Sequence, residues 1–136
     1  DDPVKMCREI FRVLKPSKKC YISFANRFGL HEYHYQLNFI NWLPRSFTEP
    51  ILKFLKKQKQ DSVIGRQKLT TMHYYTYGLI INLLRRIGFV VIDIRVEKIK
   101  KKFGFVAPIF LAPYFLLRFF YFNTFHLLLE KSNQVN

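Results

Sequence analysis

Residues Ile10–Asn26, IFRVLKPSKKCYISFAN, decide the fold class. Apolar residues before Pro16 recur at helical spacing, and Pro16 ends that helix because proline lacks a backbone donor and clashes with the preceding turn. Lys15–Lys19 then form the turn, and Cys20–Asn26 is short and mostly apolar, which is typical of a strand covered on both faces. A helix leading directly into a buried strand predicts an α/β sheet, whose ligands bind at the carboxyl ends of the strands.

The start of this first helix is marked by Asp2 and Pro3. An aspartate side chain accepts hydrogen bonds from free backbone amides of a first turn, and proline has no amide to leave unpaired there. Helical spacing predicts a buried face made of Met6, Cys7, Ile10, Phe11 and Leu14.

A second helix–strand unit follows much later in the chain. Tyr75–Phe89, YTYGLIINLLRRIGF, has helical apolar spacing, two arginines in its last turn and Gly88 as a left-handed cap. Phe89–Glu97, FVVIDIRVE, alternates with a period of two and predicts a strand. The apolar face of that strand is expected to carry Val90, Ile92, Ile94 and Val96.

Residues 27–71 between these units are irregular and predict a helical insert. Short helices are expected at Tyr35–Trp42 and Pro50–Gln58. The second has apolar and lysine-rich sides, so it would either lie on an anionic surface or be a solvated helix with one face on the core.

Composition gives one domain and a strong basic bias. The chain has 136 residues, with 23 Lys and Arg against 9 Asp and Glu. This charge favours phosphate-bearing partners, either anionic lipid or nucleic acid. Cys7 and Cys20 have no metal or disulfide spacing, so they are interpreted as reduced thiols of a cytoplasmic chain. The first ten residues do not resemble a signal peptide, and the lack of an initiating Met suggests a start inside a longer chain.

The tail, residues 99–136, combines a lysine run with a long apolar, aromatic stretch interrupted by Pro108, Pro113 and Arg118. Three interpretations remain open: a final strand and helix of the core, a peripheral membrane anchor, and a transmembrane segment. Both membrane interpretations place the lysines at an anionic cytoplasmic surface. The membrane contacts would then be Lys100, Lys101, Lys102, Phe110, Tyr114, Phe115 and Phe119.

Residues 1–26, DDPVKMCREIFRVLKPSKKCYISFAN, and 74–98, YYTYGLIINLLRRIGFVVIDIRVEK, together resemble the C-terminal half of a class I S-adenosylmethionine-dependent methyltransferase of the small, metal-independent kind. In that family a dipeptide like Asp2-Pro3 opens the helix after strand 4, and the two units lead into strands 5 and 6. The resemblance implies an α/β, Rossmann-like partial domain at residues 1–98, followed by the hydrophobic C-terminal tail at 99–136.

The chain departs from the family in two places. Ser17 and Lys18 stand where the family has a Gly-Gly pair, whose backbone adopts positive φ at low cost. The Gly-rich cofactor loop and its acidic ribose-binding residue are also missing, since no two of the five glycines lie close together. The resemblance therefore implies a half-domain that has no cofactor-binding residues of its own and needs an N-terminal half to bind S-adenosylmethionine.

By the same resemblance, the loop after the first strand and the segment before the second helix form the acceptor pocket. Methyl transfer depends mainly on alignment and exclusion of water, so these residues position the acceptor. His34 is the candidate catalytic base for an acceptor hydroxyl or amine; its alternative role, like that of His31, is a hydrogen-bonded loop residue. HEYH does not have the spacing of the zinc motif, so no metal site is expected. The acceptor-binding candidates are Asn26, His31, Tyr35, Tyr74 and Tyr75.

A second function class remains open, a non-enzymatic basic module that binds anionic membrane lipid or RNA. Aromatic residues and lysines interleave at KKKFGF, residues 100–105. Nucleic acid is the less favoured of these partners, because the predicted strand Phe89–Glu97 lacks an exposed aromatic platform. The parent methyltransferase would act on a small-molecule or lipid-like acceptor, in the cytoplasm and in part at a membrane.

Overall fold

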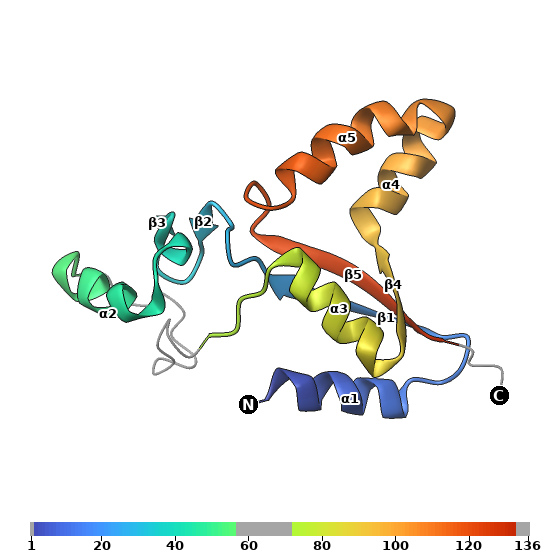
Figure 1. Ribbon diagram of the computed structural model, residues 1–136, viewed down its shortest axis with the longest axis horizontal. Helices are drawn as coiled ribbons and strands as arrows, with labels where there is room; N and C mark the ends of the chain where they lie inside the picture. Colours follow the sequence, from blue (N-terminus) through green and yellow to red (C-terminus); the bar gives the residue numbers. More distant parts are fainter. Residues whose placement is uncertain (1, 57–71, 133–136) are drawn as a thin grey trace.

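The computed structural model describes residues 2–56 and 72–132 (Figure 1). The protein is a mixed α/β structure with a three-stranded sheet, a separate two-stranded ribbon and a projecting pair of helices. Its elements are α1 (Pro3–Val13), β1 (Lys19–Ala25), β2 (His31–Glu32), β3 (Leu37–Asn38), the 3-10 helix η1 (Ile40–Trp42), α2 (Arg45–Phe54), α3 (Tyr77–Ile87), β4 (Phe89–Asp93), α4 (Ile94–Phe103), the 3-10 helix η4 (Gly104–Val106), α5 (Ala107–Leu117) and β5 (Thr124–Lys131).

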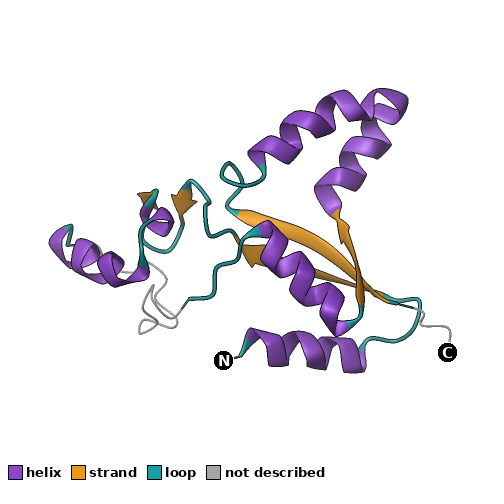
Figure 2. Cartoon of the chain, viewed as in Figure 1, coloured by secondary structure: helices purple, strands orange, loops and turns teal. Residues whose placement is uncertain are grey.

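The main sheet has the strand order β1-β5-β4, and β5 runs antiparallel to both neighbours (Figure 2). Consequently β1 and β4 run parallel to each other. Each of them is preceded in sequence by a helix, α1 before β1 and α3 before β4. The last strand in sequence is therefore the central strand of the sheet.

In both predicted units a helix leads into a strand, and the predicted caps at Asp2 and Gly88 are confirmed. The Asp2 side chain accepts a hydrogen bond from the Val4 amide at 2.9 Å, and Pro3 opens α1. Gly88 ends α3 with φ of 112°, and a Cβ built there would lie 3.0 Å from the Phe11 ring. Ser17 adopts φ of 63° in the turn before β1, so a serine here takes the left-handed conformation that glycine adopts most readily.

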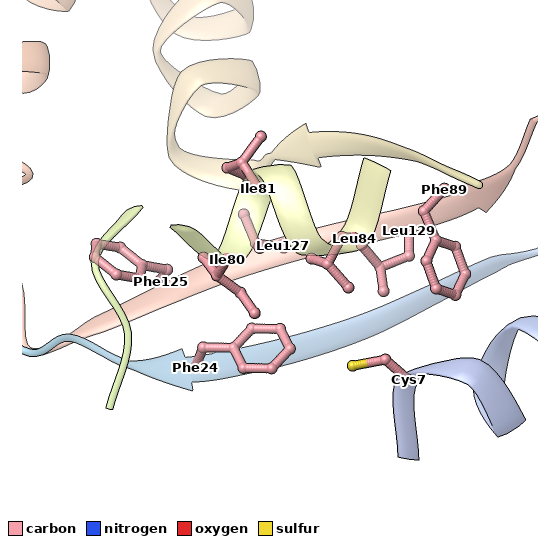
Figure 3. Packing of buried hydrophobic residues seen from close by; sticks show 9 residues of the cluster. All are labelled: Cys7, Phe24, Ile80, Ile81, Leu84, Phe89, Phe125, Leu127 and Leu129. Atoms are coloured by element: carbon pink, nitrogen blue, oxygen red, sulfur yellow. The ribbon is translucent and has the colours of Figure 1, made fainter. Parts of the chain in front are cut away.

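The core lies between one face of the sheet and the helices α1 and α3 (Figure 3). Phe11 of α1 packs edge-on against Phe89 of β4, with ring centroids 5.0 Å apart. The buried cluster consists of Cys7, Phe24, Ile80, Ile81, Leu84, Phe89, Phe125, Leu127 and Leu129. Because these residues come from α1, α3 and all three strands, they join the whole sheet region into one unit.

The opposite face of the sheet is only partly covered. Tyr21 of β1 is 58 % exposed and Val90 of β4 is 47 % exposed, whereas Phe24 of β1 is buried. The prediction that Cys20–Asn26 is covered on both faces is therefore wrong. In the described residues, the helices that precede the strands pack on a single face, so burial along β1 alternates.

The predicted strand Phe89–Glu97 is correct only as far as Asp93. There the Asp93 carboxylate accepts hydrogen bonds from the amides of Arg95 and Val96, and α4 begins at Ile94. An N-terminal cap of this kind favours a helix over continued pairing. The alternating apolar residues that suggested a longer strand fall on both sides of this boundary.

The insert also differs from the prediction. The expected helix at Tyr35–Trp42 is replaced by β3 and η1, because Gln36 and Phe39 adopt positive φ values of 53° and 60° that a helix cannot contain. The helix expected at Pro50–Gln58 starts earlier, as α2 begins at Arg45 and contains Pro50. The end of that prediction, from residue 57, lies outside the described residues.

The tail divides between two environments. β5 is buried in the sheet, with Phe125, Leu127 and Leu129 at most 2 % exposed, as the core-strand interpretation expected. Helix α5 projects from the sheet beside α4 (Figure 1). Within residues 2–56 and 72–132, no helix has both the length and the apolar character needed to cross a bilayer.

Candidate functional site

Asn26, the first acceptor-binding candidate, follows the carboxyl end of β1 and is 1 % exposed. Its Nδ2 donates hydrogen bonds to the backbone carbonyls of Phe122 at 2.7 Å and Phe119 at 3.1 Å, with a longer contact to that of Arg118 at 3.4 Å. Its Oδ1 accepts from the Phe28 amide at 3.0 Å. Asn26 thus joins the end of β1 to the α5–β5 connection, and its side chain positions these segments.

Tyr75 lies beside the same end of β1. Its ring packs edge-on against Phe24, and its amide donates to the Ala25 carbonyl at 2.9 Å. Burial raises the pKa of the Tyr75 phenol. Tyr75 also lines an open groove of about 540 Å³ along β1 and the start of α1. The other residues of this groove are Asp2, Pro3, Met6, Tyr21, Ile22, Ser23, Phe24, Ala25 and His73.

Tyr35 and Tyr74, two further candidates, meet at a carboxylate that sequence reasoning missed. Glu32 is 3 % exposed and accepts hydrogen bonds from the Tyr74 hydroxyl at 2.8 Å and the Tyr35 amide at 2.7 Å. The guanidinium of Arg45 lies over the Tyr74 ring, 4.6 Å from its centroid. A buried carboxylate requires such partners, so Glu32 is the centre of the insert's polar core.

The charges of this cluster act on one another. Burial first, and then the negative charge of Glu32, raise the pKa of Tyr74 far above its ordinary value. Burial and the nearby charge of Arg27 lower the pKa of Arg45. The Tyr74 phenol therefore stays protonated and acts as a hydrogen-bond donor, so it is suited to fixing geometry and not to accepting a proton.

The two histidines lie in and next to the β2–β3 ribbon. His31 Nδ1 is 2.7 Å from Asn38 Oδ1, and its ring meets the Tyr33 ring edge-on. His34 lies in the β2–β3 connection and is half-buried. Among residues 2–56 and 72–132, no three His, Cys, Asp or Glu side chains are placed to hold a metal ion.

The predicted site residues therefore fall into two groups. Asn26 and Tyr75 lie at the sheet, and the other four lie in the insert or against it: His31, His34, Tyr35 and Tyr74. Asn123, which sequence reasoning missed, connects the two groups through hydrogen bonds. Its Oδ1 accepts from the His31 amide at 3.0 Å, and its carbonyl accepts from the Asn26 amide at 2.8 Å. A Cβ at Gly29 would lie 2.8 Å from the Asn123 Cα, so this close approach requires glycine.

A third polar cluster lies where the α4–α5 pair leaves the sheet. Tyr114, predicted as a membrane contact, is instead 6 % exposed, and its hydroxyl donates to the Asp93 carboxylate. Burial, followed by the charge of Asp93, raises the pKa of Tyr77 to about 12. The guanidinium of Arg118 lies 3.9 Å from the Tyr77 ring centroid. This cluster fixes the base of the helical pair.

These phenols predict a loss of stability at alkaline pH. The folded-state pKa values of Tyr74, Tyr77 and Tyr114 are raised, so the unfolded chain loses these protons first. Their stabilising contribution is complete below pH about 10 and is lost as the pH rises further. For each phenol, the free energy of unfolding falls by at most about 1.4 kcal/mol per pH unit. Urea denaturation between pH 8 and 11 measures this slope, and Tyr114→Phe should reduce it; a slope unchanged in that variant contradicts the assignment.

Comparison of the chain with protein-family models, with curated proteins and with solved structures gave no significant match.

Proposed function

We propose that the chain is the C-terminal half of a metal-independent class I S-adenosylmethionine-dependent methyltransferase that acts on a small-molecule or lipid-like acceptor. The observation that carries this proposal is the topology. β1 and β4 are parallel, each follows its own helix on the same face of the sheet, and the reversed strand β5 lies between them. The sequence resemblance likewise implies two helix–strand units, one leading into strand 5 and the other into strand 6 of the family's sheet. The argument from fold to function is one of analogy.

The edge of β1 supplies the place for the missing half. Within the described residues, the only strand paired with Lys19–Ala25 is β5, and on the other edge Tyr75 pairs at the end of the strand, with Ala25 and Asn26. The rest of that edge has no strand beside it and could pair with one. The groove lined by Tyr75 runs along this strand. An N-terminal half would add a parallel strand at this edge and bring the cofactor loop to the carboxyl end of the sheet, where Asn26 and Tyr75 lie.

The chemistry assigned to this chain is alignment of the acceptor and removal of one proton. As the methyl group moves from the sulfonium sulfur to an acceptor oxygen or nitrogen, that atom loses its proton, which His34 is proposed to accept. Tyr75 and the Tyr74–Glu32 pair are proposed to hold the acceptor in line. The segments that carry these residues are fixed by Asn26 and Asn123.

The proposal is tested by calorimetry with S-adenosylmethionine. We expect no micromolar binding by the chain alone, and binding after addition of an N-terminal half that carries the strand, Gly-rich loop and helix. In that complex His34→Ala and Tyr75→Phe should lower turnover while changing cofactor affinity by less than about threefold, or about 0.7 kcal/mol. Tyr121→Phe, at a tyrosine that is 55 % exposed, is the matched control.

The outcomes separate the two function classes. Micromolar binding by the chain alone would show that the cofactor site is misplaced. A stable complex that neither binds the cofactor nor transfers methyl groups would favour the non-enzymatic basic module. Unchanged turnover in both the His34 and Tyr75 variants would make these residues purely structural.

A further inference from the structure

Helix α5 is apolar around its whole circumference, yet it lies on the surface. Between Phe103 and Leu117 the sequence contains no charged residue. Phe105, at the turn before α5, is 95 % exposed, while Ile109 and Leu116 of the helix are 70 % and 68 % exposed. Helices that are apolar on all sides belong in a protein core or in a membrane. The exposed apolar surface of the pair α4–α5 therefore requires a partner.

The charges beside this surface are almost entirely positive. Lys98, Lys100, Lys101 and Lys102 are all exposed on α4, next to the turn that carries Phe105. Glu97 is the one acidic residue of α4, and it already contacts Lys100 at 3.6 Å. Lysines bordering an aromatic apolar surface complement a layer of negative headgroups above an acyl interior.

The dimensions favour a surface docking element. Helix α5 has 11 residues, which span about 16 Å at 1.5 Å per residue. The hydrocarbon core of a bilayer is about 30 Å thick, so α5 is too short to cross it and is suited to lie at its surface. The pair is held together internally, since the rings of Phe103 and Phe110 stack with centroids 3.9 Å apart.

We propose that the α4–α5 pair docks the protein on an anionic lipid surface. Phe105 enters the bilayer first, the exposed side chains of α5 lie at the boundary between headgroups and acyl chains, and the α4 lysines contact the phosphates. A second copy of the chain is a poorer occupant of this surface, because two lysine-rich helices would be brought together and each chain has a net charge of +14.

The attachment of the pair places the sheet next to that surface. The α4–α5 pair begins directly after Asp93, at the carboxyl end of β4, where the Tyr114 hydroxyl donates to the Asp93 carboxylate (Figure 1). The chain then returns to the sheet through the α5–β5 connection, whose Phe122 carbonyl accepts a hydrogen bond from Asn26 at the carboxyl end of β1. Arg118, which interrupts the apolar run in sequence, lies over the Tyr77 ring at this base, and its guanidinium also contacts the Phe115 ring at the end of α5. If the proposed methyltransferase function holds, the acceptor comes from the membrane.

The charge part of the proposal is tested by vesicle flotation with phosphatidylcholine alone and with added phosphatidylserine. The chain should float only with the anionic vesicles. Changing Lys100, Lys101 and Lys102 together to Gln should weaken binding about 100-fold at low salt. The control changes Lys5, Lys15 and Lys18 to Gln, which removes the same charge at exposed positions of α1 and the turn that follows it, and it should have a much smaller effect.

The apolar part is tested with Phe105→Ser, for which Phe54→Ser is the matched control because Phe54 of α2 is 85 % exposed. Binding should fall about tenfold or more in the first variant and remain unchanged in the second. High salt should weaken binding only in part, because apolar burial is not screened. In a Trp42→Phe background, Phe105→Trp provides a fluorophore whose emission should shift to the blue on anionic vesicles.

Three results would overturn the proposal. The first is a protein that floats with vesicles of no composition, and the second is equal binding by the Phe105→Ser and Phe54→Ser variants. The third is loss of self-association in the ultracentrifuge in Phe105→Ser without a change in flotation. The last result would assign the surface to a second copy. None of these measurements depends on methyl transfer, so failure here leaves the proposed function to its own test.

Discussion

Leu127→Ala is expected to lower the free energy of unfolding by about 2–5 kcal/mol. Leu127 is fully buried at the centre of β5, the strand that joins β1 to β4 (Figure 3). Removing its side chain leaves a cavity between the sheet and the two helices that cover it. Because natural domains have a total stability of about 5–15 kcal/mol, this single change should remove a large part of it.

The neighbouring Leu128→Ala is the control for this experiment. Leu128 belongs to the same strand, but its side chain lies on the opposite, half-exposed face. Urea denaturation of both variants should therefore show a much smaller loss for Leu128→Ala. Equal losses would mean that the two faces of the sheet are equally buried, and would contradict the one-sided core.

Asn26→Asp is expected to lower the free energy of unfolding by about 3 kcal/mol or more at neutral pH. The substitution replaces the amide donor with a buried carboxylate oxygen that faces backbone carbonyls, including those of Phe119 and Phe122. Removing a donor from a buried site leaves its acceptors unpaired, and an unpaired buried charge adds a further penalty. Burial beside carbonyls raises the pKa of this carboxyl, so the loss should diminish as the pH falls from 7 and should be smallest by about pH 4, because a protonated carboxyl is uncharged and can again donate.

Asn82→Asp on the exposed surface of α3 is the matched control, with the same change of atoms and charge. Urea denaturation at pH 7 and pH 4 measures both variants. If Asn26→Asp is as stable as Asn82→Asp at pH 7, the hydrogen bonds between β1 and the α5–β5 connection do not hold this end of the sheet together.

The helix–strand units could be predicted because their signals are local. Asp2 and Pro3, Pro16, and Gly88 mark helix boundaries through their own backbone and side-chain preferences, and each acts where the sequence indicated. Asp93 carries the same kind of signal, as a helix cap, but the apolar alternation around it concealed the boundary. The positive φ values of Gln36 and Phe39 could not be predicted, because nothing in either side chain requires this conformation.

The position of β5 and the polar contacts of the site depend on tertiary structure. Phe125, Leu127 and Leu129 alternate as a strand should, but they follow an apolar stretch in which a period of two is hard to separate from a buried helix. Glu32 and Asn123 likewise have no distinctive neighbours in sequence; their partners Tyr74 and His31 come from distant segments. Its place at a strand end predicts Asn26 as a site residue, but its hydrogen-bond partners come from the distant α5–β5 connection and depend on the fold.

The central position of β5 has a consequence for folding. β1 and β4 are both synthesised before the strand that joins them, and Cys20 of β1 pairs with Leu129, more than a hundred residues later. Contacts so distant in sequence form slowly, because a long loop must close before they contribute. The α4–α5 pair precedes β5 and so leaves the ribosome while the sheet is still incomplete. During that interval its apolar surface is exposed together with unpaired strands, so an early encounter with lipid would protect the nascent chain from aggregation.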